Sequence, residues 1–237
     1  MSNFQETANF IWQVADDILR NAFKPHEYGD VILPFVVLRR LDGVLEPVKD
    51  QVIAAYAQFE GRLDEDAMHP VVLQATHGMQ FYNASLYDLR RLAQDANNIE
   101  SNFEAYLNGF SKNVRGMIEN FQIDKIVGKL SRHNLLFMLV SKFTEVNLNP
   151  AQVSNHEMGY TFEHLIYKFY EMSNETAGEH YTPREVIRLM VNLLFAEHGG
   201  ELQGKGLVRS VFDPACGTGG MLTIAKAHIQ EQINDVG

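Results

Sequence analysis

Apolar residues recur at intervals of three and four through the first two thirds of the chain. Between residues 4 and 23 the recurring positions are Phe10, Ile11, Val14, Ile18 and Leu19. The same period returns in residues 27–48, 84–110, 131–147 and 156–172, and strict alternation is almost absent before residue 170. This period is typical of helices with one buried face. Residues 1–160 are therefore predicted to form a helical N-terminal domain.

The segment 27–48 is the most apolar of these helices, and it contains two polar interruptions. Pro34 lies inside it and is expected to kink the helix, because proline lacks a backbone N–H. Arg39, Arg40 and Asp42 follow as a polar group. The sequence allows two interpretations of this group, a solvated helix end or a patch that binds a partner.

Two helix starts carry capping sequences. Ser85 and Asp88 form a capping pair that is expected to open the helix after residue 84. Further along, Thr182 suits the N-cap, Pro183 the first helical position and Glu185 the third, which predicts a capping box.

The pattern changes after residue 170, where a polar loop precedes a strongly specified helix that ends at Gly199-Gly200. The predicted buried face of this helix comprises Val186, Ile187, Met190, Val191, Leu193 and Leu194. Residues 207–213 are rich in β-branched residues and favour a central parallel strand, and residues 220–233 favour a final helix. Residues 161–237 are therefore predicted to be the truncated start of an α/β domain. The fold class is mainly α.

Composition indicates an ordinary globular protein, with 46% hydrophobic and 21% charged residues. A lone cysteine, Cys216, fits a reducing compartment, and the longest apolar run, residues 31–38, is too short to span a membrane. The N-terminus has no signal-peptide pattern, so a cytoplasmic protein is expected. The formal net charge is −10. If the protein acts on nucleic acid, most phosphate contacts must come from another subunit or another part of the chain.

A glycine-rich turn, Asp213-Pro-Ala-Cys-Gly-Thr-Gly-Gly220, joins the predicted strand to the last helix. Such a turn brings backbone N–H groups close to a ligand, and a plain tight turn would need fewer glycines. A Walker loop requires a lysine that is absent, and Leu222 breaks the dinucleotide fingerprint. S-adenosylmethionine is the third candidate, because Asp213 would suit its ammonium group. Cys216 is interpreted as a small buried residue.

No metal site is expected, since the sequence His156-Glu-Met-Gly-Tyr160 has tyrosine where a zinc motif needs histidine.

The motif from Asp213 to Gly220 resembles the cofactor motif of adenine-specific DNA methyltransferases, above all the modification subunit of type I restriction-modification systems. Gly178-Glu-His-Tyr-Thr-Pro-Arg184 is similar to a second family segment, and the apolar helix at residues 31–42 is typical of the same subunit. The resemblance implies S-adenosylmethionine binding by two groups of residues. They are Glu179, His180, Tyr181, Thr182, Pro183 and Arg184, and Asp213, Pro214, Cys216, Gly217, Thr218, Gly219 and Gly220.

The same resemblance implies methyl transfer to adenine N6 in double-stranded DNA, together with a specificity subunit and a restriction subunit. The family's catalytic [NDS]-P-P-[YF] motif is missing: Asn149-Pro150 continues as Ala-Gln, and Asp213-Pro214 as Ala-Cys. We therefore assign no catalytic residue and expect the chain to be an N-terminal fragment. Two alternatives stay open, a stand-alone S-adenosylmethionine methyltransferase with another substrate and a non-catalytic module that docks partners.

Overall fold

The structure, a computed structural model, describes residues 3–172, 182–196, 210–217 and 219–234. The chain divides into two compact units, Met1–Ser173 and Asn174–Gly237. The boundary predicted between residues 160 and 161 falls inside a continuous helix, Asn155–Met172, and it stays a prediction.

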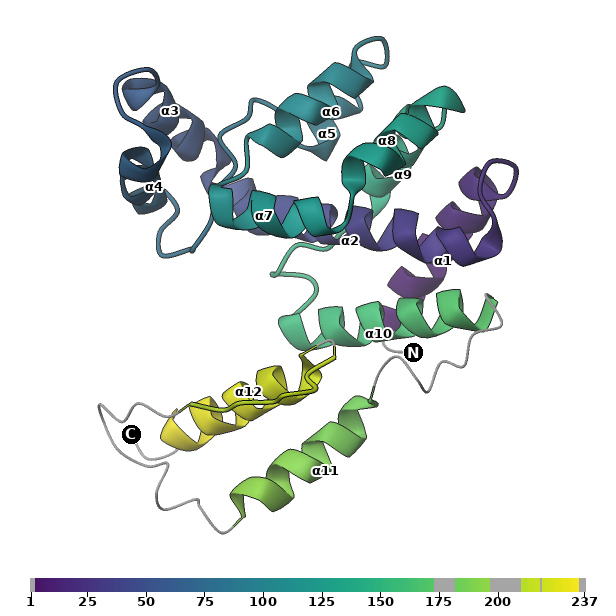
Figure 1. Cartoon of the computed structure of the whole chain (residues 1–237), viewed down its shortest axis with the longest axis vertical. Coiled ribbons are helices and arrows are strands. Elements are labelled where there is room, and N and C mark those ends of the chain that lie inside the picture. The colour runs from purple at the N-terminus through teal and green to yellow at the C-terminus, as the bar shows by residue number, and fades with distance from the viewer. Residues whose placement is uncertain (1–2, 173–181, 197–209, 218, 235–237) are drawn as a thin grey trace. The chain divides into compact units, whose positions relative to one another are not determined.

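The first unit is built from helices joined by turns and by longer loops (Figure 1). Its α-helices are α1 (Asn3–Leu19), α2 (Tyr28–Leu45), α3 (Lys49–Phe59), α4 (Glu65–Gln74), α5 (Leu89–Leu92), α6 (Ile99–Asn108), α7 (Lys112–Asn120), α8 (Ile123–Arg132), α9 (Leu136–Glu145) and α10 (Asn155–Met172). Two 3-10 turns, η1 (Pro25–Glu27) and η2 (Glu46–Val48), flank α2. The prediction of a helical N-terminal region is confirmed for the described residues.

Helix α2 forms the centre of this unit and packs against α1, α9 and α10. Its Phe35 is fully buried, and the Phe35 ring lies 5.6 Å from that of Phe103 in α6 and 5.5 Å from that of Phe143 in α9. Aromatic pairs at such distances stabilise a core beyond their buried area alone. The helix continues through Pro34 without interruption. The apolar run of the sequence thus forms the unit's core.

Helices α3, α4, α7 and α8 lie in segments for which the sequence had given no separate helix prediction. The predicted capping pair is only half right. Asp88 is the N-cap of α5, and its carboxylate accepts a hydrogen bond from Arg91 N at 2.8 Å. The hydroxyl of Ser85 instead accepts from Tyr87 N, two residues further on, and so stabilises a local turn before the helix.

The described part of the second unit contains two helices, α11 (Arg184–Phe195) and α12 (Gly220–Asn234). Their shared core consists of Ile187, Val191, Phe195 and Ala225. Two contacts fix their direction. Ile187 lies against Gly220, and eight residues later in each helix the ring of Phe195 stacks on that of His228 at 5.6 Å. The helices therefore run parallel and side by side, with both N-termini at the same end (Figure 1).

The predicted strand is not present in the described residues. Residues 210–213 form neither helix nor strand, and residues 207–209 lie outside the description. A strand needs neighbours to complete its hydrogen bonds, and the described residues of this unit offer none. The side chain of Phe212 is accordingly 86% exposed.

Helix α11 also departs from its prediction. Pro183, with φ −56° and ψ 141°, occupies the N-cap position, so the helix begins one residue late and the Thr182–Glu185 capping box does not form. The predicted buried face is correct for two of its six residues, because Ile187 and Val191 are buried. Four of its residues are exposed: Val186, Met190, Leu193 and Leu194. Helix α12 packs on α11 and covers a single stripe of it. The predicted stop at Gly199-Gly200 lies outside the described residues.

Candidate functional site

The glycine-rich turn has a defined backbone. The Asp213 carboxylate accepts a hydrogen bond from Ala215 N at 3.0 Å, which holds the first bend as an Asx turn. Gly219 N then donates to Cys216 O at 2.8 Å and closes the second bend. The second carboxylate oxygen of Asp213 has no hydrogen-bond donor among the described residues. The turn therefore delivers a half-buried acid and the start of α12 to one place.

Two of the glycines are required by the backbone. Gly217 has φ +51° and Gly219 has φ +77°, in the left-handed region that other residues rarely adopt. A Cβ built on either would meet no atom within 4 Å, so the space above both is open. Gly220 is different, because it is helical and a Cβ there would lie 2.7 Å from Ile187 Cδ1. Gly217 and Gly219 thus permit the backbone angles of the turn, and Gly220 permits close helix packing.

The start of α11 lies beside this turn, because Gly220 contacts Ile187 in the first turn of α11. Thr182 and Pro183 are exposed there, and Arg184 is half-buried. The first N–H groups of a helix lack partners within it and favour negative groups. Residues 182–184, the described part of the first motif, and the glycine-rich turn, about thirty residues apart, thus lie at one end of a parallel helix pair.

Not every predicted site residue can be located. Glu179, His180, Tyr181 and Thr218 lie outside the described residues. Pro214 is exposed within the turn. Cys216 is also exposed, which corrects the expectation of a buried cysteine.

In the polar group of α2, Arg39 and Asp42 are buried and Arg40 is half-buried, which makes the prediction of a solvated helix end wrong. Arg39 is 3% exposed and donates from Nε to Val146 O at 2.7 Å. Arg40 donates to Leu148 O and Val153 O at 2.6 and 2.8 Å. Both arginines therefore hold the segment between α9 and α10 against α2. They donate hydrogen bonds to backbone carbonyls of that non-helical segment, which have no helical hydrogen bond of their own.

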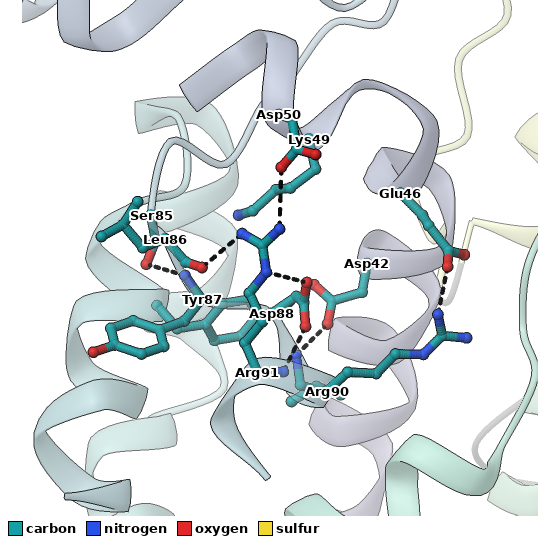
Figure 2. Close-up of polar contacts among 12 residues, drawn as sticks. Asp42, Glu46, Lys49, Asp50, Ser85, Leu86, Tyr87, Asp88, Arg90 and Arg91 are labelled. Carbon is teal, nitrogen blue, oxygen red and sulfur yellow. Dashed lines mark hydrogen bonds and ion pairs between the residues drawn. The ribbon is translucent and has the colours of Figure 1, made fainter. Parts of the chain in front are cut away.

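Asp42 is the acidic member of this group, and it lies beside α5 (Figure 2). Its two oxygens accept hydrogen bonds from Leu89 N and from the Tyr106 hydroxyl, both at 2.8 Å. Burial raises the pKa of Asp42 to about 6, although both hydrogen bonds favour the ionised form. Lys49 is buried close by and donates to Asn83 O and Oδ1. Burial lowers the pKa of Lys49 to about 8.

One signal in the sequence could have revealed this buried cluster. Arg39 and Asp42 are spaced three apart and stand among Leu38, Leu41 and Leu45, within an apolar helix. A charged pair inside an apolar stripe is expensive to bury unless its hydrogen bonds are satisfied. Their partners, however, come from segments up to about a hundred residues away, which the sequence does not reveal.

Comparisons with known proteins agree with this architecture. A family model described as the HsdM N-terminal domain matches residues 7–143, and a second, described as N-6 DNA methylase, matches residues 153–237. The methylase subunit of the type I restriction enzyme EcoEI from Escherichia coli is 32% identical over 120 residues, covering 51% of this chain and 22% of that protein. The MjaIX methylase subunit from Methanocaldococcus jannaschii is 23% identical over 263 aligned positions, covering 98% of this chain and 41% of that protein.

The glycine-rich turn lies in the segment that the N-6 DNA methylase model matches, and it follows a helical unit that the HsdM N-terminal model matches over most of its length. The first model alone covers more than half of the chain, and the chain belongs to the HsdM family, the methylase subunits of type I restriction enzymes. The chain spans about a fifth to two fifths of the length of the curated relatives it matches. Among the described residues, no helix is both long enough and apolar enough to cross a membrane.

Proposed function

We propose that this chain forms part of a site-specific DNA methyltransferase that transfers a methyl group from S-adenosylmethionine to adenine N6 within a type I restriction-modification complex. One observation carries the proposal. The turn at residues 213–220 and the start of α11 meet at one end of a parallel helix pair, in a segment that matches the N-6 DNA methylases. The described parts of the two motifs that resemble the family's cofactor segments, residues 182–184 and the glycine-rich turn, are thus neighbours, which supports the proposal.

The residues present fit this cofactor. The open space above Gly217 and Gly219 would admit a ligand to the backbone, and any side chain there would fill it. Asp213 is half-buried with one carboxylate oxygen unused, which suits the cofactor's ammonium group. The free N–H groups at the start of α12 would favour its carboxylate. S-adenosylmethionine, when bound, supplies the methyl group.

Adenine N6 is reached only when the base is flipped out of the duplex. The amine must then be held in line with the methyl donor by hydrogen-bond acceptors. In the family that the sequence resembles, an [NDS]-P-P-[YF] motif provides these acceptors, and residues 1–237 do not contain it. We therefore propose that this chain binds the methyl donor and that residues outside it hold the flipped adenine.

The 237-residue chain alone is therefore expected to transfer no methyl group. Incubation with unmodified duplex DNA and methyl-labelled cofactor should give label on DNA at background level, because the acceptors that orient the amine are absent. The complete subunit with its specificity subunit serves as positive control. Clear labelling of adenine by this chain alone would show that it contains a catalytic site that the proposal does not include.

We further propose that the first unit docks protein partners, with a specificity subunit as the reader of DNA sequence and a restriction subunit as the nuclease. The net charge of −10 gives little electrostatic support for independent duplex binding. The described surface of this unit also exposes large apolar side chains, among them Leu86 at 66% and Met117 at 60%. Such residues contribute more to protein interfaces than to phosphate contacts.

This chain is expected to capture the specificity subunit in a pull-down and to give little gel shift with duplex DNA at physiological salt. The weak shift follows from the acidic charge, since duplex affinity depends on neutralised phosphates. Repeating the shift with the captured subunit present provides the control. A tight, sequence-selective shift by this chain, without capture of the subunit, would reverse the assignment of roles.

A further inference from the structure

A small polar pocket opens beside the buried cluster of α2. Its volume is about 200 Å³. The walls come from α2, η2, α3 and α5, so the pocket lies where four elements of the first unit meet (Figure 2). Four cations line it, Arg39, Lys49, Arg90 and Arg91. The acids that line it are Asp42, Glu46, Asp50 and Asp88.

Most of these charges have partners. Arg90 pairs with Glu46 at 2.5 Å, and Arg91 pairs with Asp50 at 3.0 Å. Asp88 lies 3.7 Å from Arg91 Nε. As described above, Lys49 and the Asp42 carboxylate are hydrogen-bonded to neighbouring segments. The rim of the pocket is therefore a set of local pairs in which charge is balanced.

Arg39 is the exception. It is 97% buried, and its Nε bonds Val146 O, but neither terminal nitrogen has a hydrogen-bond or ion-pair partner among the described residues. Of the described side-chain atoms, only His69 Nδ1 and Ser131 Oγ are completely enclosed and also unpaired. The terminal nitrogens of Arg39 must therefore touch accessible space, and the pocket is the space that Arg39 lines. A guanidinium cannot lose its charge, so the pocket presents a cation whose terminal donors are free, with Asp42 and Glu46 near enough to attract it.

We propose that this pocket binds one carboxylate, carried by a glutamate or aspartate side chain of a protein partner. The planar guanidinium edge matches a planar carboxylate in two parallel hydrogen bonds. A pocket of about 200 Å³ admits a single side chain. Leu86, 66% exposed, is joined to Arg91 through its carbonyl and offers an apolar contact beside the pocket.

The rim favours a protein carboxylate over a DNA phosphate. Glu46, Asp50 and Asp88 surround the opening, and the Asp50 side chain is 86% exposed. A duplex carries one charge per ~1.7 Å of its axis, so it would bring several phosphates to a rim whose cations are already paired, and only Arg39 could bind one of them. The side chain of one glutamate or aspartate brings a single negative charge, which pairs with Arg39 and places no further negative charge at the rim. This inference does not depend on the cofactor assignment, since every residue involved lies in the first unit.

The test uses nitrogen-15 spectra of arginine Nε–H groups in the 237-residue chain. Arg39 Nε is buried and hydrogen-bonded, so its resonance should be protected from exchange, and its loss in Arg39→Lys assigns it. The probes are acetate, capped glutamate (acetyl-Glu-N-methylamide) and its neutral match, capped glutamine, at constant ionic strength. A 12-base-pair duplex forms the nucleic-acid arm.

Capped glutamate is expected to shift the Arg39 resonance saturably and capped glutamine to leave it unchanged. Asp50→Asn keeps an acceptor for Arg91 and removes an exposed charge, so it should tighten binding by ~3-fold. Arg39→Lys keeps the charge and loses the planar fork, so affinity should fall by ~10-fold or more. Arg132→Lys, at an exposed site in α8, is the matched control and should change nothing.

Three outcomes would overturn the proposal. The first is the absence of a saturable shift with either carboxylate probe, or an equal shift with capped glutamine. The second is tighter binding of acetate than of capped glutamate, which would make a free small anion the ligand. The third is a shift of Arg39 by the duplex without one by capped glutamate, which would assign the pocket to a phosphate. Because Asp50→Asn alters only an exposed side chain, its result holds even if Arg39→Lys fails to fold.

Discussion

Replacing Gly219 by valine in the complete methylase subunit is expected to lower S-adenosylmethionine affinity by at least ~100-fold. Gly219 has φ +77°, a conformation that costs a β-branched residue roughly 1–3 kcal/mol. Its Cβ position is open in the structure, so the new side chain would occupy the space proposed for the ligand. Strain and steric exclusion act together, and each ~1.4 kcal/mol is a factor of ten in affinity.

Gly61→Val is the matched control for this substitution. Gly61 has φ +72° and, like Gly219, no atom within 4 Å of a built Cβ, but it lies in the first unit. It should cost similar stability and leave cofactor affinity unchanged in calorimetric titration. Asp213→Asn separates charge from structure at the same site, because an amide oxygen can still accept from Ala215 N. Asp213→Asn should weaken binding, and Asp213→Ala should weaken it further. Unchanged affinity in Gly219→Val, with the fold intact by circular dichroism, would remove the turn from the cofactor site.

Replacing Asp42 by alanine is expected to destabilise the first unit by ~3 kcal/mol. The substitution leaves Leu89 N and the Tyr106 hydroxyl without acceptors, both in buried positions. Lys49, buried nearby, also loses an attractive charge. Urea unfolding followed by circular dichroism measures the loss. Tyr106→Phe removes only one of the two donors and should cost ~1 kcal/mol. Glu46→Ala breaks an exposed ion pair with Arg90 and should cost at most ~1 kcal/mol.

The pH dependence of this destabilisation has a defined sign. The pKa of Asp42 is about 6 in the folded chain, above its ordinary value of 3.8, so the folded state holds a proton that the unfolded state releases. The stabilisation from that proton is complete below pH 3.8 and is lost as the pH rises to about 6. The cost of Asp42→Ala should therefore be largest near pH 4 and decrease towards pH 6. A cost that grows over this interval would show that burial does not raise this pKa.

The helical character of the first unit was predictable because its information is local. Apolar spacing in α1, α2, α9 and α10 identifies a helix within a single segment. The helices α3, α4, α7 and α8 are short, and their few buried residues, such as Val114 and Ile118 in α7, give too brief a pattern. The roles of Arg39 and Asp42 were missed for a different reason, since their partners are distant in sequence. Burial of a charge depends on tertiary contacts.

In the candidate site, too, the features that depend on residue type were predictable, whereas those that depend on tertiary contacts were not. Left-handed angles at Gly217 and Gly219 followed from residue type, because glycine alone adopts them at no cost. The packing role of Gly220 did not, since it depends on Ile187, thirty-three positions earlier. The capping box at Thr182 failed because Pro183 keeps an extended ψ of 141° and occupies the cap itself. Local propensity identified that helix and misplaced its start by one residue.

Methyl transfer by the reconstituted complex tests the central claim most directly. The complete methylase subunit, its specificity subunit and unmodified duplex DNA are incubated with S-adenosylmethionine labelled in the methyl group, and the DNA is digested to nucleosides for chromatography. The label should appear in N6-methyladenine and should fall to background with Gly219→Val while persisting with Gly61→Val. Label in methylcytosine, or equal N6-methyladenine from both variants, would contradict the account.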